Sequence, residues 1–126
     1  MHTVSDTERI AAVEAYIDAL VSHDADAVPF ADDCVRIEVG LKTGFSGDHL
    51  RRSLNRGPQY RVISGATDRK FTVKGDEVHA TFTIVTKAAF GGRRVVAHVD
   101  ETFLIPHGKI HHIRARITPT LRREQT

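Results

Sequence analysis

Residues 91–105 read GGRRVVAHVDETFLI, and this stretch decides the class of the fold. The paired glycines predict a tight hairpin turn, and the run after them, rich in Val, Thr and Phe, predicts a strand over 93–105. Successive side chains on a strand point to opposite faces. One face of this strand carries three polar residues and the other two apolar ones: His98, Asp100 and Thr102 against Val99 and Phe103. We interpret the polar set as pointing into the fold.

The segments around this strand extend the sheet. Turn residues divide the second half of the chain into further strands, which are predicted over 59–73, 78–87 and 109–118. Gly65 is expected to mark a bulge or bend. Pro119 is expected to end the last strand and to leave 120–126 as a frayed, polar tail.

The first half of the chain is expected to be mainly helical. Ser5 and Glu8 have the spacing of a capping box, and apolar residues then recur at helical intervals. Shorter helices are predicted over 27–31 and about 47–55, with a strand over 35–39 between them. Three helices and a long, bent sheet predict an α+β domain. A sheet that curls in this way encloses a cone, which is a natural pocket.

Length and composition bound the class of protein. A chain of 126 residues is enough for one core, so we expect a single domain over 1–126. No apolar run approaches the roughly 20 residues of a membrane span, and the first residues lack the pattern of a signal peptide. The single cysteine, Cys34, cannot form an internal disulfide. We therefore expect a cytoplasmic protein.

Charge is distributed unevenly along the chain. Residues 1–50 contain ten acids and three basic residues, whereas residues 51–126 contain six acids and fifteen basic residues. Such asymmetry can mark a surface for a polyanion or a membrane. The basic residues lie mostly on predicted strands and turns, separated by apolar positions, and the sheet lacks adjacent aromatics for base stacking. We interpret them as a solvated sheet face and expect neither a nucleic acid nor a membrane as partner.

Motifs for metal, phosphate or nucleophilic chemistry are missing from the sequence. Among the eight histidines, His111 and His112 would point to opposite faces of a strand, and there is no HExxH or CxxC pattern. No Gly-x-Ser-x-Gly elbow and no phosphate-binding glycine loop is present. We expect neither a metal nor a cofactor.

Carboxylates on the predicted strands are the remaining candidates for chemistry. A carboxylate in an apolar interior must be hydrogen-bonded or kept protonated, because burying its charge is costly. Asp100 and Glu38 would face that situation if they point inward. Alternatively, both face solvent or pair with Arg94 or Arg36. Periodicity alone leaves the two interpretations open.

Several segments, in order along the chain, resemble bacterial ketosteroid isomerases and, more widely, the NTF2-like (SnoaL-like) superfamily. They are residues 16–20, 30–33, 92–100, 103 and 108–110. The resemblance implies a curved antiparallel or mixed sheet wrapped by three helices into a cone. It also implies a homodimer formed through the outer face of the sheet, and a small hydrophobic molecule as the partner.

The resemblance assigns roles to individual residues. Tyr16 and Asp100 match the two donors of the oxyanion hole, and Glu38 matches the catalytic base. This implies cofactor-free proton transfer on a small hydrophobic carbonyl compound. By strand parity, the apolar lining of the pocket is expected to be Leu104, Ile113, Ala115 and Ile117.

Two other functions stay open at this stage. His98 and Asp100 also resemble the paired polar residues of dehydratases, polyketide cyclases and epoxide hydrolases of this fold, with an ionised Asp100 orienting His98. The third reading is a non-catalytic domain for ligand binding or dimerisation. The direction of Asp100 separates them, since it would face Tyr16 in an isomerase, His98 in a hydratase and solvent in a binding domain.

Overall fold

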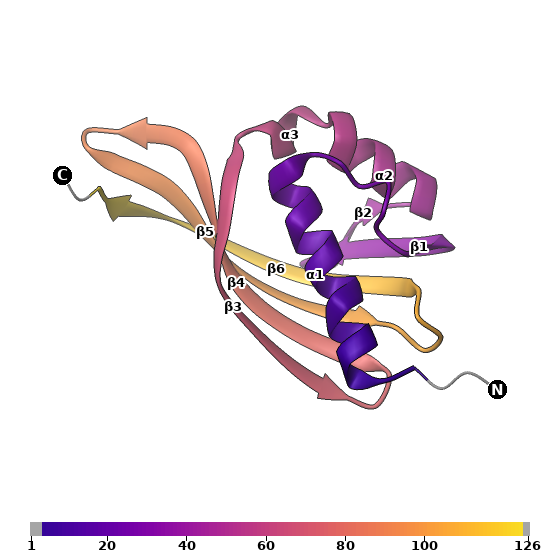
Figure 1. The fold of residues 1–126 in the computed structure, drawn as a ribbon. Coiled ribbons are helices and arrows are strands. Elements are labelled where there is room, and N and C mark those ends of the chain that lie inside the picture. Colours follow the sequence, from indigo (N-terminus) through magenta and orange to yellow (C-terminus); the bar gives the residue numbers. More distant parts are fainter. Residues whose placement is uncertain (1–3, 125–126) are drawn as a thin grey trace.

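A strongly curved sheet with helices on one side makes up the computed structural model, which describes residues 4–124 (Figure 1). The strands are β1 (Phe30–Glu38), β2 (Leu41–Gly44), β3 (Ile63–Lys74), β4 (Glu77–Phe90), β5 (Arg93–Leu104) and β6 (Ile110–Arg123). The helices are α1 (Asp6–Ser22), α2 (Gly47–Arg56) and the single turn α3 (Pro58–Arg61). The predicted α+β cone is therefore confirmed.

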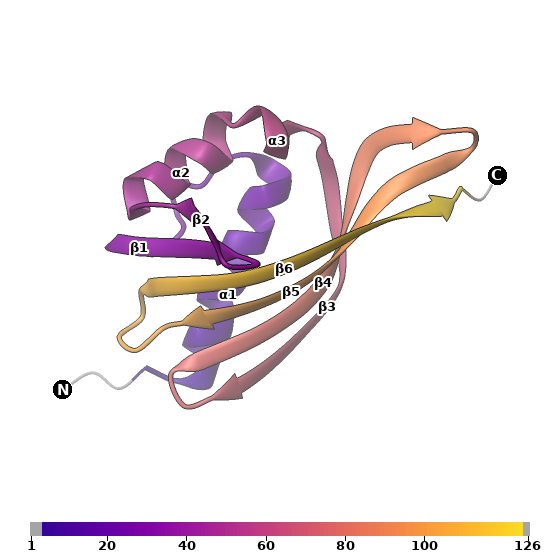
Figure 2. The ribbon, with the colours of Figure 1, turned by 180° about the vertical axis from the view of Figure 1, so that it is seen from behind.

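The sheet is mixed, and its order does not follow the chain. The strands lie in the order β2-β1-β6-β5-β4-β3. All neighbours are antiparallel except β1 and β6, which run parallel. Figure 2 shows β6 passing from its place beside β1 to the far end of the sheet. The expected hairpin at 91–92 and the irregularity at Gly65 are both present.

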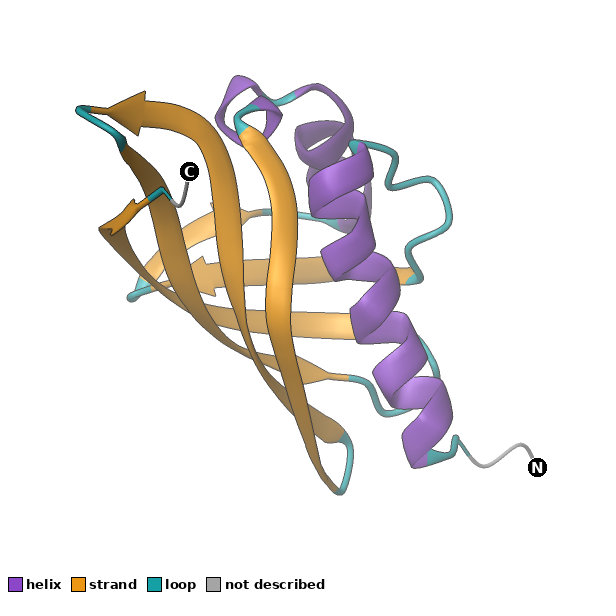
Figure 3. Cartoon of the chain, turned by 60° about the vertical axis from the view of Figure 1, so that its left-hand side comes forward, coloured by secondary structure: helices purple, strands orange, loops and turns teal. Residues whose placement is uncertain are grey.

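Helix α1 closes the open side of the curved sheet (Figure 3). It begins as predicted, because the Ser5 side chain accepts from the Glu8 backbone and Glu8 reaches back to the Ser5 backbone. Its apolar face, which includes Tyr16 and Ile17, is buried against the concave face of the sheet. Among residues 4–124, no helix has the length and apolar character needed to cross a membrane.

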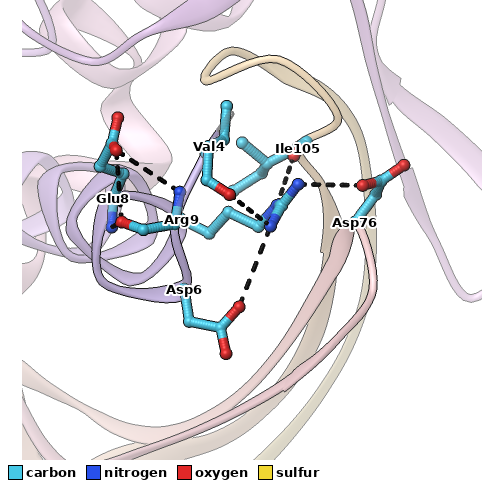
Figure 4. A network of polar contacts seen from close by, with 7 residues as sticks. Val4, Asp6, Glu8, Arg9, Asp76 and Ile105 are labelled. Carbon is cyan, nitrogen blue, oxygen red and sulfur yellow. Dashed lines mark hydrogen bonds and ion pairs between the residues drawn. The ribbon is translucent and has the colours of Figure 1, made fainter. Parts of the chain in front are cut away.

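A buried arginine fixes the start of α1 to the sheet (Figure 4). Arg9 Nε donates to the carbonyl oxygen of Ile105 at 2.8 Å, and Nη1 donates to the carbonyl oxygen of Val4 at 3.1 Å. Nη2 donates to Asp76 Oδ1, in the β3–β4 turn, at 2.9 Å. Each of the three nitrogens thus has a partner, and the helix is tied to two loops of the sheet.

Three boundaries predicted from the sequence are wrong. The strand expected over 59–73 begins at Ile63, because Pro58–Arg61 forms the helical turn α3. Residues 27–31 do not form a helix, because Phe30 already belongs to β1 and pairs with Ile110 of β6. Pro119 does not end the last strand, and residues 120–123 continue it instead of fraying. Strand β1 pairs with β6 only as far as Ala115, so Pro119 lies where β6 is an edge strand and its missing N–H is tolerated. Residues 125–126 of the expected tail lie outside the described residues.

Candidate functional site

The polar face predicted to point inward on β5 points outward instead. His98 and Asp100 are exposed, whereas Val99 and Phe103 are fully buried. The two large apolar side chains decide which face joins the core, because their burial outweighs the placement of the polar ones. Asp100 Oδ1 lies 2.7 Å from His79 Nε2 on the outer face. Asp100 therefore contacts neither Tyr16 nor the interior, and the expectation of an inward Asp100 is wrong. The direction of Asp100 by itself favours the binding domain over the two enzyme alternatives, so any catalytic role must rest on other residues.

Tyr16 and Glu38 occupy different depths of the fold. Tyr16 is fully buried, with its ring edge-on to those of Phe30 and Phe103 at centroid distances of 6.1 and 5.3 Å. Glu38 is partly exposed and accepts a hydrogen bond of 2.8 Å from Arg36 Nη1. The pairing with Arg36 is the alternative that periodicity left open for Glu38.

Three of the four expected lining residues point to the interior. Ile113 and Ala115 are buried on β6, and Ile117 packs against the core. Leu104 does not join them, because it has the same parity on β5 as Asp100 and pairs with Glu77 of β4. The apolar wall of the interior is thus formed by β6 without Leu104.

Glu101 is the interior carboxyl that the sequence analysis did not select. Only 1% of its surface is exposed, because it shares a face with Val99 and Phe103. The signal was present in the sequence, since a glutamate between two core residues of the same parity must also face the core. Burial at this position turns a common surface residue into a candidate for chemistry.

Arg36 lies at the centre of a polar cluster that extends from the surface into the core, and that we call the Arg36 cluster: Arg36, Glu101, Glu38, Thr43, Tyr16 and Tyr60. The Arg36 side chain is only 5% exposed. Its Nη1 donates to Glu38 Oε1 and to Thr43 Oγ1, each at 2.8 Å. Its Nε lies 3.8 Å from Glu101 Oε2. The cluster thus leads from the partly exposed Glu38 inward to the enclosed Glu101.

Strand register explains how side chains from β1 and β5 meet across β6. Glu38 on β1 pairs with Ala115 on β6, which in turn pairs with Glu101 on β5. On its other side, Glu101 pairs with Ala80 of β4. Both neighbours of Glu101 are therefore alanines, and their short side chains leave the space in which Arg36 can approach the carboxyl.

Two atoms of the cluster lack a hydrogen-bond partner within the described part of the chain. They are Arg36 Nε and Glu101 Oε2, both buried. Buried polar atoms are nearly always paired, so each such atom requires an explanation. An oxygen atom placed between them could accept from Nε and donate to Oε2. A water molecule or the oxygen function of a small molecule meets this requirement.

Burial changes the acid–base properties of the cluster. Desolvation raises the pKa of Glu101 to about 7, although Arg36 lowers it and Glu38 raises it further. Burial also raises the pKa of Tyr16 well above its ordinary value, while the positive charge of Arg36 acts in the opposite direction. Burial likewise raises the pKa of Tyr60. Near neutral pH, Glu101 therefore exchanges a proton while both tyrosines stay neutral donors.

Comparison with family models gives one match. The model described as "Domain of unknown function (DUF8021)" matches residues 3–117, which is most of the chain. None of the curated protein sequences matches.

Solved structures give strong matches over nearly the whole length. An LEH-like epoxide hydrolase of M. tuberculosis is 25% identical with a TM-score of 0.69, covering 88% of this chain and 83% of that one. An NTF2-like protein of Burkholderia xenovorans LB400 is 16% identical with a TM-score of 0.65, covering 90% and 91%. The epoxide hydrolase/cyclase-like enzyme SalBIII is 17% identical with a TM-score of 0.68, covering 90% and 92%. The predicted NTF2-like superfamily is confirmed, and the fold is one that small-molecule enzymes use.

Proposed function

This chain belongs to the DUF8021 family, and we propose that it catalyses cofactor-free proton transfer on a small, largely apolar molecule bound inside the cone. The observation that carries the proposal is Glu101, a fully enclosed carboxyl with a pKa of about 7. A general acid or base works best when its pKa lies near the working pH. The unpaired Oε2 of Glu101, beside the unpaired Nε of Arg36, marks where the reacting group would lie.

The substrate we propose is a hydrophobic carbonyl compound. Ionised Glu101 takes a proton from the carbon next to the carbonyl, and the electrons of the C–H bond move toward the carbonyl oxygen to give an enolate. Protonated Glu101 then returns the proton to the γ-carbon of the unsaturated ketone, which restores the carbonyl and the ionised carboxylate. The guanidinium of Arg36 and the neutral hydroxyl of Tyr16 stabilise the enolate oxygen. In this proposal, Glu38 orients Arg36 through their 2.8 Å hydrogen bond. The base is therefore Glu101, and neither Glu38 nor Asp100 has the role that the resemblance implied.

A second candidate is the hydrolysis of an epoxide. The M. tuberculosis structure, at 25% identity, is described as an LEH-like epoxide hydrolase. Two carboxyl groups flank Arg36 here, of which Glu101 titrates near neutral pH. Protonated Glu101 would then act as the acid on the epoxide oxygen, and Glu38 would activate the attacking water. The two candidates use the same carboxyl in opposite protonation states.

The test is the pH dependence of kcat/KM for two substrates, a β,γ-unsaturated ketone and an epoxide. If Glu101 is the base, kcat/KM for the ketone rises with pH and levels off above about 7. If Glu101 is the acid, kcat/KM for the epoxide falls over the same range. Glu101→Gln should lower turnover of the active substrate by about 10²- to 10⁴-fold.

The matched control is Glu14→Gln, which makes the same chemical change at an exposed position on α1. It should keep turnover within about threefold of the wild type, as surface substitutions usually do. Wild-type turnover in Glu101→Gln would contradict the proposal, as would an equal loss in both variants.

The homodimer through the outer face stays a prediction.

A further inference from the structure

A three-stranded arm extends beyond the helices at one end of the sheet (Figure 1). It consists of residues 85–97, which form the β4–β5 hairpin, and residues 118–124 at the end of β6. Both views of the ribbon show it pointing away from α1 and α2. Strand β5 is its central strand, because β4 and β6 pair with β5 on either side. The arm lies apart from the Arg36 cluster.

Positive charge is concentrated on the arm in an unfavourable arrangement. Five basic residues and one acid lie on it: Lys87, Arg93, Arg94, Arg122, Arg123 and Glu124. Arg93 lies directly opposite Arg123, and Arg94 lies directly opposite Arg122. Like charges opposite each other destabilise a sheet. Glu124 forms an ion pair with Arg94, so the acid on the arm balances only part of this charge.

Apolar side chains share one face of the arm with part of this charge. Phe90 lies opposite Arg93, in the same row as Arg123, and Leu121 lies two residues before Arg123 on β6. Both apolar residues are exposed, Phe90 to 67% and Leu121 to 50%. A protruding face that combines apolar side chains with arginines is costly in water and is typical of an interaction site.

Protection of sheet edges does not explain the arm. Charged residues and proline commonly prevent edge strands from pairing with other sheets, and Pro119 with the arginines of β6 fits that purpose. Arg93 and Arg94, however, lie on the central strand, which has no free edge here. Edge protection also gives no reason to expose Phe90 beside the turn.

We propose that the arm docks on a membrane surface that carries anionic lipids. Arg93 and Arg123 would bind the lipid phosphates, which removes the repulsion between these two arginines. Phe90 and Leu121 would enter the boundary between headgroups and acyl chains. Arg94 and Arg122 belong to the adjacent row and therefore lie on the opposite face of the arm, where Arg94 is already paired with Glu124. The proposed contact therefore uses the face of Arg93, Arg123, Phe90 and Leu121.

The apolar residues favour a membrane over a nucleic acid. Binding of single strands relies on aromatic side chains on which successive bases stack, and the arm offers one aromatic residue, Phe90. An aliphatic residue such as Leu121 gains nothing from a phosphate backbone but is buried by lipid. The proposal reverses the expectation from the sequence that no membrane is involved.

The test is co-sedimentation with vesicles of phosphatidylcholine alone or with about one third phosphatidylglycerol, using the full chain. The wild type should bind the anionic vesicles, and added salt should weaken this binding. The double variant Arg93→Gln/Arg123→Gln should weaken it by about tenfold or more, as expected for two basic residues at an anionic surface. Phe90→Ser should keep binding at low salt and lose it at moderate salt.

The control is Arg52→Gln/Arg56→Gln, which removes the same charge from exposed positions on α2. It should bind anionic vesicles as the wild type does. Equal loss in this control would overturn the proposal, as would the absence of vesicle binding. If the wild type binds a DNA oligonucleotide but not vesicles, and Arg93→Gln/Arg123→Gln abolishes the DNA binding, the arm is a nucleic-acid-binding surface and the membrane proposal is wrong.

Discussion

Two arginines are buried among residues 4–124, and they differ in how many of their donors are used. Arg9 donates from all three nitrogens, to two backbone carbonyls and to Asp76 (Figure 4). Arg36 is buried as deeply, yet its Nε has no partner among the described residues and lies near the equally unpaired Oε2 of Glu101. A saturated buried arginine holds elements together. In the proposed function, the unused donor of Arg36 beside the titrating carboxyl of Glu101 marks the place of the substrate.

The largest expected effect comes from removing each arginine and measuring turnover. Arg36→Met should lower turnover at least about a hundredfold, because the developing negative charge loses its cation. Arg9→Met should change kcat by less than about threefold, since Arg9 contacts no residue of the Arg36 cluster. Circular dichroism would check that both variants are folded. A similar loss of turnover in the two variants would remove the distinction between the arginines.

The free energy of unfolding of Arg9→Met tests the anchoring role of Arg9. Arg9→Met leaves the carbonyl oxygens of Ile105 and Val4 without their donor, so the free energy of unfolding should fall by about 3 kcal/mol. Urea denaturation monitored by circular dichroism measures this loss. If Arg9→Met unfolds at the same urea concentration as the wild type, the anchoring role assigned to Arg9 is wrong.

The dependence of stability on pH sharpens the account of Glu101. Its pKa is about 7 in the fold, against 4.5 as its ordinary value. The folded state therefore binds the proton more tightly, so stability is fully present below about pH 4.5 and is lost as the pH rises through about 7. The loss attributable to this group is about 3 kcal/mol.

Glu101→Gln removes this titration, and its unfolding free energy should vary less between pH 5 and 8 than that of the wild type. Glu14→Gln, the same chemical change at an exposed position on α1, should keep the wild-type slope. Parallel pH profiles for the wild type and Glu101→Gln would show that Glu101 does not titrate in this range.

The smallest expected effect concerns the space beside the carboxyl. Ala115→Val adds two methyl groups between the strands that carry Glu38 and Glu101. It should raise KM about tenfold, the usual scale for crowding a binding site by one or two carbons. Ala89→Val makes the same change on the exposed part of β4 and should leave KM unaltered. An unchanged KM in Ala115→Val would place the substrate elsewhere.

Local signals in the sequence predicted most of the fold. The capping box at Ser5 and the paired glycines at 91–92 each depend on neighbours in the chain, and both predictions are confirmed. The helix over 27–31 failed because the parallel pairing of Phe30 with Ile110 decides that segment, and no local pattern reports such a distant contact.

The candidate site was less accessible to prediction. The alternation along β5 correctly grouped the side chains into two faces. The choice of the inward face was wrong, because the burial of Val99 and Phe103 matters more than the position of His98 and Asp100. The approach of Arg36 to Glu101 depends on a register across three strands. Such a register follows only from the assembled sheet.

The parallel contact between β1 and β6 also bears on the order of folding. Strands β3 to β6 follow one another as antiparallel neighbours and can pair by short turns, whereas β1 must reach across the chain to β6. Contacts between distant segments cost more loop entropy and generally form later. Arg36 belongs to β1 and Glu101 to β5, so the acid–base centre is assembled only when this last strand is added. A folding intermediate in which β1 has not yet joined the sheet can already contain the arm, which is formed by β4, β5 and β6. It cannot contain the pair of Arg36 and Glu101, because Arg36 lies on β1.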